Sequence, residues 1–235
     1  MTGTLYLIPN TLGDCNPSKV IPSHVYDVVR PLRHFIVEDI RTARRYLRKL
    51  HRDFPIDDCS FLTLNQHTDR KRLDAFLTPL LQGHDVGVIS EAGCPAVADP
   101  GADVVALAQR QGIQVVPLVG PSSILLAQMA SGFNGQSFAF VGYLPIEPDA
   151  RSRRLRQLEA RAVAESQTQL FIETPYRNQK LYALILNTCS PKTRLCVATD
   201  ITLDSESIRT HTIAQWKTMA EPELNHRPTI FAIFK

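Results

Sequence analysis

Residues 85–101 read DVGVISEAGCPAVADPG, and the order of their parts predicts the fold of the first half of the chain. The apolar run Asp85–Ser90 has the length and composition of a buried strand. A loop rich in glycine and proline follows, and Ala102–Gln111 then has the apolar spacing of a helix. Strand, sharp loop and helix in this order are typical of one unit of a parallel α/β sheet.

The same alternation continues on both sides of this unit. Strands joined by helical connections favour a parallel sheet with helices on both of its faces. The other predicted strands are Thr4–Ile8, Phe35–Val37, Phe61–Leu64 and Ile113–Leu118, and the other predicted helices are Arg41–His51, Arg70–Leu81 and Ser122–Ala130.

The second half of the chain has a different pattern, in which the last two strand-like segments alternate apolar and polar residues as antiparallel strands do. The predicted strands are Phe138–Val141, Thr168–Ile172, Arg194–Thr199, Ile208–Ile213 and Thr229–Phe234, and the predicted helices are Arg153–Ala164 and Gln179–Leu186. We therefore expect two α/β domains, residues 1–119 with a parallel sheet and residues 120–235 with a mixed sheet. A cleft between two domains is a common place for a ligand.

The composition excludes several classes of protein. The chain has 235 residues, of which 44% are hydrophobic and 21% charged, as in ordinary globular proteins and unlike disordered or coiled-coil chains. Its five cysteines are scattered without a CxxC pair, so we expect neither disulfides nor a metal site. The first residues lack the features of a signal peptide, and no apolar run reaches the roughly 18 residues of a membrane helix. These features predict a cytoplasmic protein that does not bind membranes.

Three loops of unusual composition each follow the end of a predicted strand: Pro9–Asp14, Ser90–Pro95, which runs on to Asp99–Gly101, and Val119–Ser123. The carboxyl ends of parallel strands meet at one edge of the sheet, where ligands bind in such folds. Glycine, proline and serine are also common in ordinary turns, but three such loops at one edge favour a shared pocket. The chain has neither GxxxxGK[ST] nor GxGxxG, which excludes a phosphate-binding P-loop and a dinucleotide fingerprint.

These loops and four further segments resemble the tetrapyrrole methylase family, the class III S-adenosylmethionine-dependent methyltransferases. Within that family the chain is most similar to the ribosomal small-subunit RNA methyltransferase I branch. The similar segments occur in the same order and at similar spacing over nearly the whole chain. They are LYLIPNTLGD (5–14), VEDIR (37–41), VISEAGCPAVADPG (88–101), VPLVGPSS (116–123), FVGYLP (140–145) and FIETPYR (171–177).

The resemblance implies a homodimeric enzyme of two α/β domains that holds S-adenosylmethionine between them. It implies methylation of a ribose 2′-hydroxyl in ribosomal RNA of the small subunit. The residues that the resemblance places around the cofactor are Pro9, Asn10, Leu12, Gly13, Glu91, Ala92, Gly93, Pro95, Pro121, Ser122 and Ser123.

The chain departs from the branch at four places, which leaves the acceptor open. The branch has PTPIGN where residues 9–14 read PNTLGD, and EDTR where residues 38–41 read EDIR. It has SDAGTP where residues 90–95 read SEAGCP, and KGE where residues 226–228 read HRP. Two alternatives therefore remain: a methyltransferase acting on a tetrapyrrole or another small molecule, and a non-catalytic RNA-binding protein that has kept the fold.

Loss of a proton from a hydroxyl acceptor is helped by a general base or a nearby cation. Glu38, Asp39 and Arg41 are the candidate catalytic residues because they follow a predicted strand at the rim. Glu173 and Arg177 lie in a similar place in the second domain. Surface or interdomain ion pairs are the alternative explanation for all five residues.

The net charge of +3 is small, but the arginines are clustered. Aligned arginines either bind phosphates or form a solvated helix face. One cluster falls on one face of a predicted helix, and two others lie at 70–72 and 151–161. The arginines of the first are Arg41, Arg44, Arg45, Arg48 and Arg52, and those of the last are Arg151, Arg153, Arg154, Arg156 and Arg161.

Overall fold

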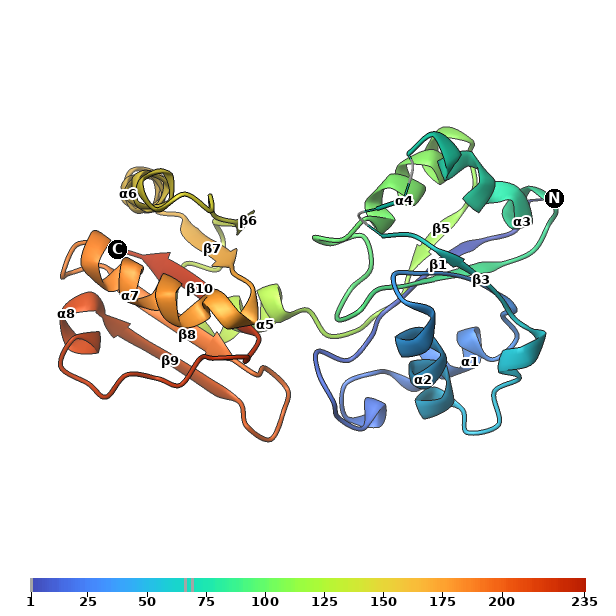
Figure 1. Cartoon of the computed structure of the whole chain (residues 1–235), viewed down its shortest axis with the longest axis horizontal. Coiled ribbons are helices and arrows are strands. Elements are labelled where there is room, and N and C mark those ends of the chain that lie inside the picture. Colours follow the sequence, from blue (N-terminus) through green and yellow to red (C-terminus); the bar gives the residue numbers. More distant parts are fainter. Residues whose placement is uncertain (1, 66, 69) are drawn as a thin grey trace. The chain divides into compact units, whose positions relative to one another are not determined.

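The computed structural model describes residues 2–65, 67–68 and 70–235. The side chains of residues 70–72 lie outside this description, and with them the basic cluster predicted there. The chain divides into two units, Met1–Ser122 and Ser123–Lys235, which are called the first and the second unit (Figure 1). The sequence had suggested a boundary after residue 119, in the segment that joins them.

The first unit contains a parallel sheet with the strand order β3-β2-β4-β1-β5. The strands are β1 (Leu5–Ile8), β2 (His34–Val37), β3 (Ser60–Thr63), β4 (Val86–Ile89) and β5 (Val115–Pro117). Every residue of β4 is buried, as expected for a central strand covered on both faces. At Gly87 a Cβ atom would lie 2.4 Å from Cδ1 of Ile8, so the neighbouring strand leaves no room for a side chain.

Helices cover both faces of this sheet (Figure 1). Neighbouring residues of one strand point to opposite faces: Phe35 packs with α1 (Ser23–Val29) and α2 (Ile40–Leu50), whereas Ile36 packs with α3 (Thr78–Leu81) and α4 (Gly101–Arg110). The short 3₁₀ turn η2 (Ile56–Asp58) adds Ile56 to the face covered by α1 and α2, and another, η1 (Pro17–Lys19), precedes α1. The predicted parallel α/β arrangement is confirmed.

Two details of the first unit differ from the sequence prediction. The segment predicted as a helix over Arg70–Leu81 is a 3₁₀ helix, η3 (Arg70–Leu77), followed by the short α3. Pro79 has no N–H to donate to a carbonyl four residues earlier, so one α-helix cannot run through it without losing a bond. Helix α1 was not predicted, because seven residues behind Pro22 give too short an apolar pattern.

The second unit contains a mixed sheet with the order β6-β7-β10-β8-β9, in which β6 and β7 are parallel and the other pairs antiparallel. The strands are β6 (Phe138–Tyr143), β7 (Thr168–Ile172), β8 (Arg194–Thr199), β9 (Ser207–Thr212) and β10 (Thr229–Phe234). The helices are α5 (Ser123–Ser131), α6 (Pro148–Ala164), α7 (Asn178–Thr188) and α8 (Ile213–Trp216), with the turn η4 (Pro175–Arg177) before α7. The mixed sheet is as predicted.

The core of the second unit is built around aromatic side chains. The rings of Phe171 and Phe231 stack on neighbouring strands, with their centroids 6.0 Å apart. Tyr182 of α7 and Trp216 of α8 meet edge to face, and Trp216 Nε1 donates to the carbonyl of Leu195. Within the described residues, no helix is both long and apolar enough to cross a bilayer, and no three metal-binding side chains are grouped.

Candidate functional site

Asn10 joins the loops that follow β1 and β4. Its backbone forms a two-way bridge with Gly93, with Asn10 N donating to Gly93 O at 2.9 Å and Gly93 N to Asn10 O at 3.2 Å. Its buried side chain donates from Nδ2 to the carbonyls of Ser90 at 3.0 Å and Glu91 at 3.1 Å. These four bonds hold the two loops in one arrangement at the carboxyl edge of the sheet.

The loop after β5 closes against the same place. The thiol of Cys94 lies 3.5 Å from the carbonyl oxygen of Pro121. Gly93 has φ +69°, and a Cβ atom there would lie 3.2 Å from Leu12 Cδ2 and 3.5 Å from Pro121 O. A Cβ atom on Gly120 would lie 2.1 Å from Cβ of Pro9. Glycines at 93 and 120 therefore let the three loops approach one another.

The structure thus brings together the residues that the resemblance placed around a cofactor, with one exception. Ser123 is the first residue of α5 and belongs to the second unit. The members buried in the first unit are Pro9, Asn10, Gly93, Pro95 and Pro121; Leu12, Gly13 and Ser122 are partly exposed, and Glu91 and Ala92 are exposed.

Glu38 and Asp39, which follow β2, have different surroundings. Glu38 Oε1 accepts a hydrogen bond from Glu91 N at 3.1 Å, so Glu38 is part of the loop cluster. Asp39 is exposed and caps α2, because its Oδ1 accepts from Thr42 N at 2.8 Å. That bond lowers the pKa of Asp39 below its usual value. Thr42 Oγ1 in turn donates to Glu91 Oε1 at 2.8 Å, which orients that carboxylate.

Burial raises the pKa of Glu38, and the nearby carboxylates of Asp99 and Glu91 act in the same direction. The hydrogen bond from Glu91 N opposes this rise. Burial also raises the pKa of Asp99, which accepts from Gly101 N at 2.6 Å. Glu38 and Asp99 line one small cavity under the loops. Both carboxyl groups therefore hold a proton more readily than exposed ones do.

Sequence reasoning missed Thr42 and Tyr46, and it included Asp99 in the second loop without giving it a role. Tyr46 of α2 donates its hydroxyl to the carbonyl of Pro9, and its buried position fixes the first loop against the helix. Only Asp99 had a sequence signal, since it stands in the ADPG segment before α4. Thr42 and Tyr46 occupy unremarkable helical positions, and only the fold brings them to the loops.

The predicted basic face of α2 lines a hollow on the surface of the first unit. Arg44 pairs with Asp57 at 3.1 Å and Lys49 with Asp14, whereas Arg45 and Arg48 make no ion pair with any described residue. The residues that line the hollow are Asp39, Ile40, Arg41, Arg44, Arg45, Arg48 and Lys49. Arg52 was wrongly included in this face, because α2 ends at Leu50.

Comparison with known sequences identifies the family. Residues 24–217 match the family described as "Tetrapyrrole (Corrin/Porphyrin) Methylases". The chain belongs to this family. It is 30% identical over 223 residues to a Vibrio cholerae protein named "Ribosomal RNA small subunit methyltransferase I", covering 95% of this chain and 73% of that protein. A Pseudomonas aeruginosa protein of the same name is 29% identical, with 91% and 71% covered.

Solved structures agree with the fold of this methylase. The methyltransferase CobJ superposes with a TM-score of 0.65 at 15% identity, covering 100% of this chain and 94% of that chain. The cobalt precorrin-4 methyltransferase CbiF gives 0.62 at 15% identity, covering 98% and 94%. The predicted family, enzyme class and α/β fold are confirmed.

In this methylase Glu173 and Arg177 form an ion pair, but it is centred on a buried carboxylate within the second unit and is neither a surface nor an interdomain pair. The Glu173 carboxylate is buried and forms ion pairs with Arg177 Nη2 at 2.6 Å and with Arg151 Nη2 at 3.5 Å. Arg151 is itself buried, so its assignment to an exposed basic cluster was wrong. Arg161, from the same predicted cluster, pairs with Glu165 at 3.0 Å.

Proposed function

We propose that this methylase transfers a methyl group from S-adenosylmethionine to ribosomal RNA of the small subunit, at a ribose 2′-hydroxyl. The observation that supports this most is the cluster of three joined loops beside the basic hollow of α2. The proposed cofactor loops and the proposed phosphate-binding face of α2 then both belong to the first unit. The names of the Vibrio cholerae and Pseudomonas aeruginosa relatives point to the same substrate.

The residues present fit the cofactor. Gly93 at φ +69° and Gly120 let the three loops pack together closely, since a Cβ atom at either position would meet Leu12, Pro121 or Pro9. The exposed Glu91 carboxylate, oriented by Thr42, suits the ammonium or the ribose hydroxyls of the cofactor. The loops Pro9–Gly13, Glu91–Pro95 and Pro121–Ser123 would hold it. When bound, it supplies a methyl group on a positively charged sulfur.

The chain's own contribution to the reaction is positioning and proton removal. Methyl displacement needs the acceptor oxygen in line with the methyl carbon and the sulfur, so fixed loops supply much of the rate. We assign Glu38 as the base, because its carboxyl is half-buried at the loop cluster and its pKa is raised. Asp39 orients α2 through its cap, and Arg41 would neutralise the charge that develops on the acceptor oxygen.

The exposed arginines of α2 would hold the RNA backbone. Arg45 and Arg48 have no carboxylate partner among the described residues, so their guanidinium groups remain available to phosphates. Arg44 and Lys49 already have carboxylate partners and contribute less to phosphate binding.

We also infer that the enzyme is a cytoplasmic homodimer. Light scattering of the purified protein tests its oligomeric state.

The experiment that tests this function uses the purified chain in two steps. Calorimetry first measures binding of S-adenosylmethionine, and absence of binding would leave only the non-catalytic alternative. Transfer of a labelled methyl group is then measured with small ribosomal subunits from a strain lacking the gene and, separately, with uroporphyrinogen. We expect label in the RNA; label in the tetrapyrrole alone would support the small-molecule alternative instead.

A further inference from the structure

Three large side chains are exposed at one edge of the sheet of the second unit. Tyr143 is 58% exposed, Ile146 70% and Tyr176 60%. Tyr143 ends β6, Ile146 follows it in the next loop, and Tyr176 lies in the turn η4 after β7. Because β6 and β7 are parallel neighbours, the segments that follow them leave the sheet at the same edge. Large exposed side chains on segments that leave the sheet at the same edge indicate a candidate interaction surface.

The two segments at this edge are held by one buried carboxylate. Glu173 Oε1 accepts from Arg177 Nε at 2.7 Å, which fixes the end of η4. Arg151 pairs with Glu173 and also donates to the carbonyls of Pro145 at 2.6 Å and Ile146 at 3.1 Å. The loop after β6 and the turn after β7 are therefore fixed by the same ion pairs.

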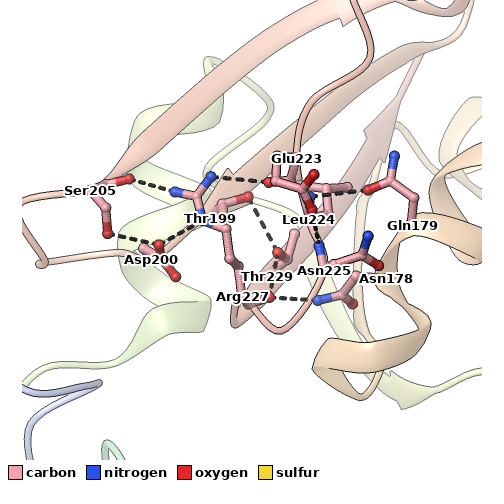
Figure 2. Close-up of polar contacts among 10 residues, drawn as sticks. All are labelled: Asn178, Gln179, Thr199, Asp200, Ser205, Glu223, Leu224, Asn225, Arg227 and Thr229. Carbon is pink, nitrogen blue, oxygen red and sulfur yellow. Dashed lines mark hydrogen bonds and ion pairs between the residues drawn. The ribbon is translucent and has the colours of Figure 1, made fainter.

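A second network holds η4 from its other side. His226 N donates to the carbonyl of Pro175 at 3.2 Å, and Asn178 Nδ2 donates to the carbonyl of Arg227 at 2.7 Å. Figure 2 shows that Arg227 is fixed in turn, since its guanidinium reaches Asp200 at 2.8 Å and the carbonyls of Ser205 and Glu223. A turn anchored on both sides has little conformational entropy left to lose when a ligand binds.

Within this anchored turn, one face of the Tyr176 ring is already occupied. The guanidinium carbon of Arg177 lies 5.3 Å from the ring centroid, in the range of a cation–π contact. Since the side chain is still 60% exposed, the rest of the ring is available to a second flat group. A tyrosine backed by arginine suits a nucleobase, because every base can stack on an aromatic ring.

Charged side chains of both signs surround Tyr176, and the guanidinium of Arg177 contacts the ring. Two arginines, Arg151 and Arg177, face the single carboxylate of Glu173, which leaves positive charge beside the ring. The start of α6 adds two carboxylates and two arginines, and the segment before His226 adds the carboxylates of Glu221 and Glu223, so the wider surroundings carry charges of both signs. An exposed tyrosine ring backed by a guanidinium fits a single strand whose bases are unpaired, whereas a duplex offers it no free base face.

We propose that Tyr176 stacks on an unpaired base of the RNA acceptor, with Tyr143 and Ile146 extending the same surface. This inference rests on the proposed function, because it names how the second unit recognises the RNA. It assigns a specificity role to an unpaired nucleotide of the acceptor RNA and leaves the methyl-transfer residues of the first unit unchanged.

The test measures binding of a single-stranded RNA oligonucleotide containing 2-aminopurine, whose fluorescence is quenched when the base stacks. The variants are Tyr176→Ala, Tyr176→Phe and, as a matched control at an exposed apolar site of the same unit, Val163→Ala, which is 52% exposed in the wild type. We expect Tyr176→Ala to lose quenching and about 10-fold in affinity, while Tyr176→Phe and Val163→Ala resemble the wild type. Affinity for duplex RNA of the same sequence should not change.

The possible failures are distinguishable. Wild-type quenching and affinity in Tyr176→Ala would overturn this inference and leave the proposed function standing. A changed oligomeric state of Tyr176→Ala with unchanged RNA affinity would assign the surface to a second copy of the chain and would also overturn it. A wild-type protein that binds the cofactor but no RNA would overturn both this inference and the RNA part of the proposed function.

Discussion

At the scale of single residues, Asn10 shows what the sequence reveals and what it does not. Its place in a loop after a strand could be predicted from the proline before it and the glycine after it. Its hydrogen bonds to Ser90 and Glu91 could not, because these residues are 80 and 81 positions away and only the parallel sheet brings them close. The same holds for the hydrogen bond of Thr42 with Glu91.

Asn10→Ala should weaken S-adenosylmethionine binding, because it removes the two side-chain bonds between the loops. Leaving the carbonyls of Ser90 and Glu91 without a donor costs on the order of 1–3 kcal/mol. Calorimetry measures the cofactor affinity and thermal unfolding the stability. The control Asn225→Ala, at an exposed position of the second unit, should leave both unchanged. Wild-type cofactor affinity in Asn10→Ala would remove this residue from the site.

The carboxyl groups of Glu38 and Asp99 predict a pH dependence of stability. Their pKa values are raised in the folded protein, so the folded state binds more protons than the unfolded state above the ordinary values of 4.5 and 3.8. Stability should therefore fall as the pH rises from these values through the folded pKa values. Glu38→Gln and Asp99→Asn should each reduce this fall, measured by urea unfolding from pH 4 to 8. An unchanged slope in both variants would contradict the burial of these groups.

At the scale of elements, most helices and strands could be predicted because their apolar spacing is regular. The exceptions have local causes: Pro79 interrupts the helix predicted over Arg70–Leu81, and the unpredicted helices α1 and α8 are too short to give a clear pattern. For α2 the sequence indicated a basic face but not which arginines are free. The structure shows that Arg44 is paired with Asp57, whereas Arg45 and Arg48 have no ion-pair partner in the described part of the chain.

Arg45→Glu combined with Arg48→Glu should weaken RNA binding and make it less sensitive to salt. For a single strand, the slope of log affinity against log salt becomes shallower by roughly 0.7 for each phosphate that the protein no longer neutralises. Filter binding at several salt concentrations measures the slope. The control Arg110→Glu, at the end of α4, removes a positive charge from another exposed helix. If both proteins bound RNA alike, the basic face of α2 would be only a solvated surface.

Glu173→Gln should destabilise the second unit, since it leaves Arg151 and Arg177 without their shared carboxylate. Removing one partner of a buried ion pair typically costs about 3–5 kcal/mol, whereas an exposed pair is worth about 1 kcal/mol or less. Urea unfolding measures the difference, with Glu165→Gln, which disrupts the exposed pair with Arg161, as the control. Equal stability of the two variants would contradict the structural role of Glu173.

At the scale of the whole molecule, the two units differ in what each contributes. The first contains the loop cluster and the basic hollow, and the second the turn with Tyr176 and its two polar networks. The small net charge of +3 did not indicate the unpaired arginines of α2, because a net charge counts paired and unpaired arginines equally. The proposed cofactor loops therefore lie mainly in the first unit, with Ser123 in the second, and the proposed base-stacking surface lies in the second unit.

The most direct test of the proposed activity is a map of ribose methylation on small-subunit RNA from a strain lacking the gene. We predict that one 2′-O-methyl group is absent in that strain and returns when the wild-type gene is supplied on a plasmid. An identical methylation map with and without the gene would contradict the proposed activity.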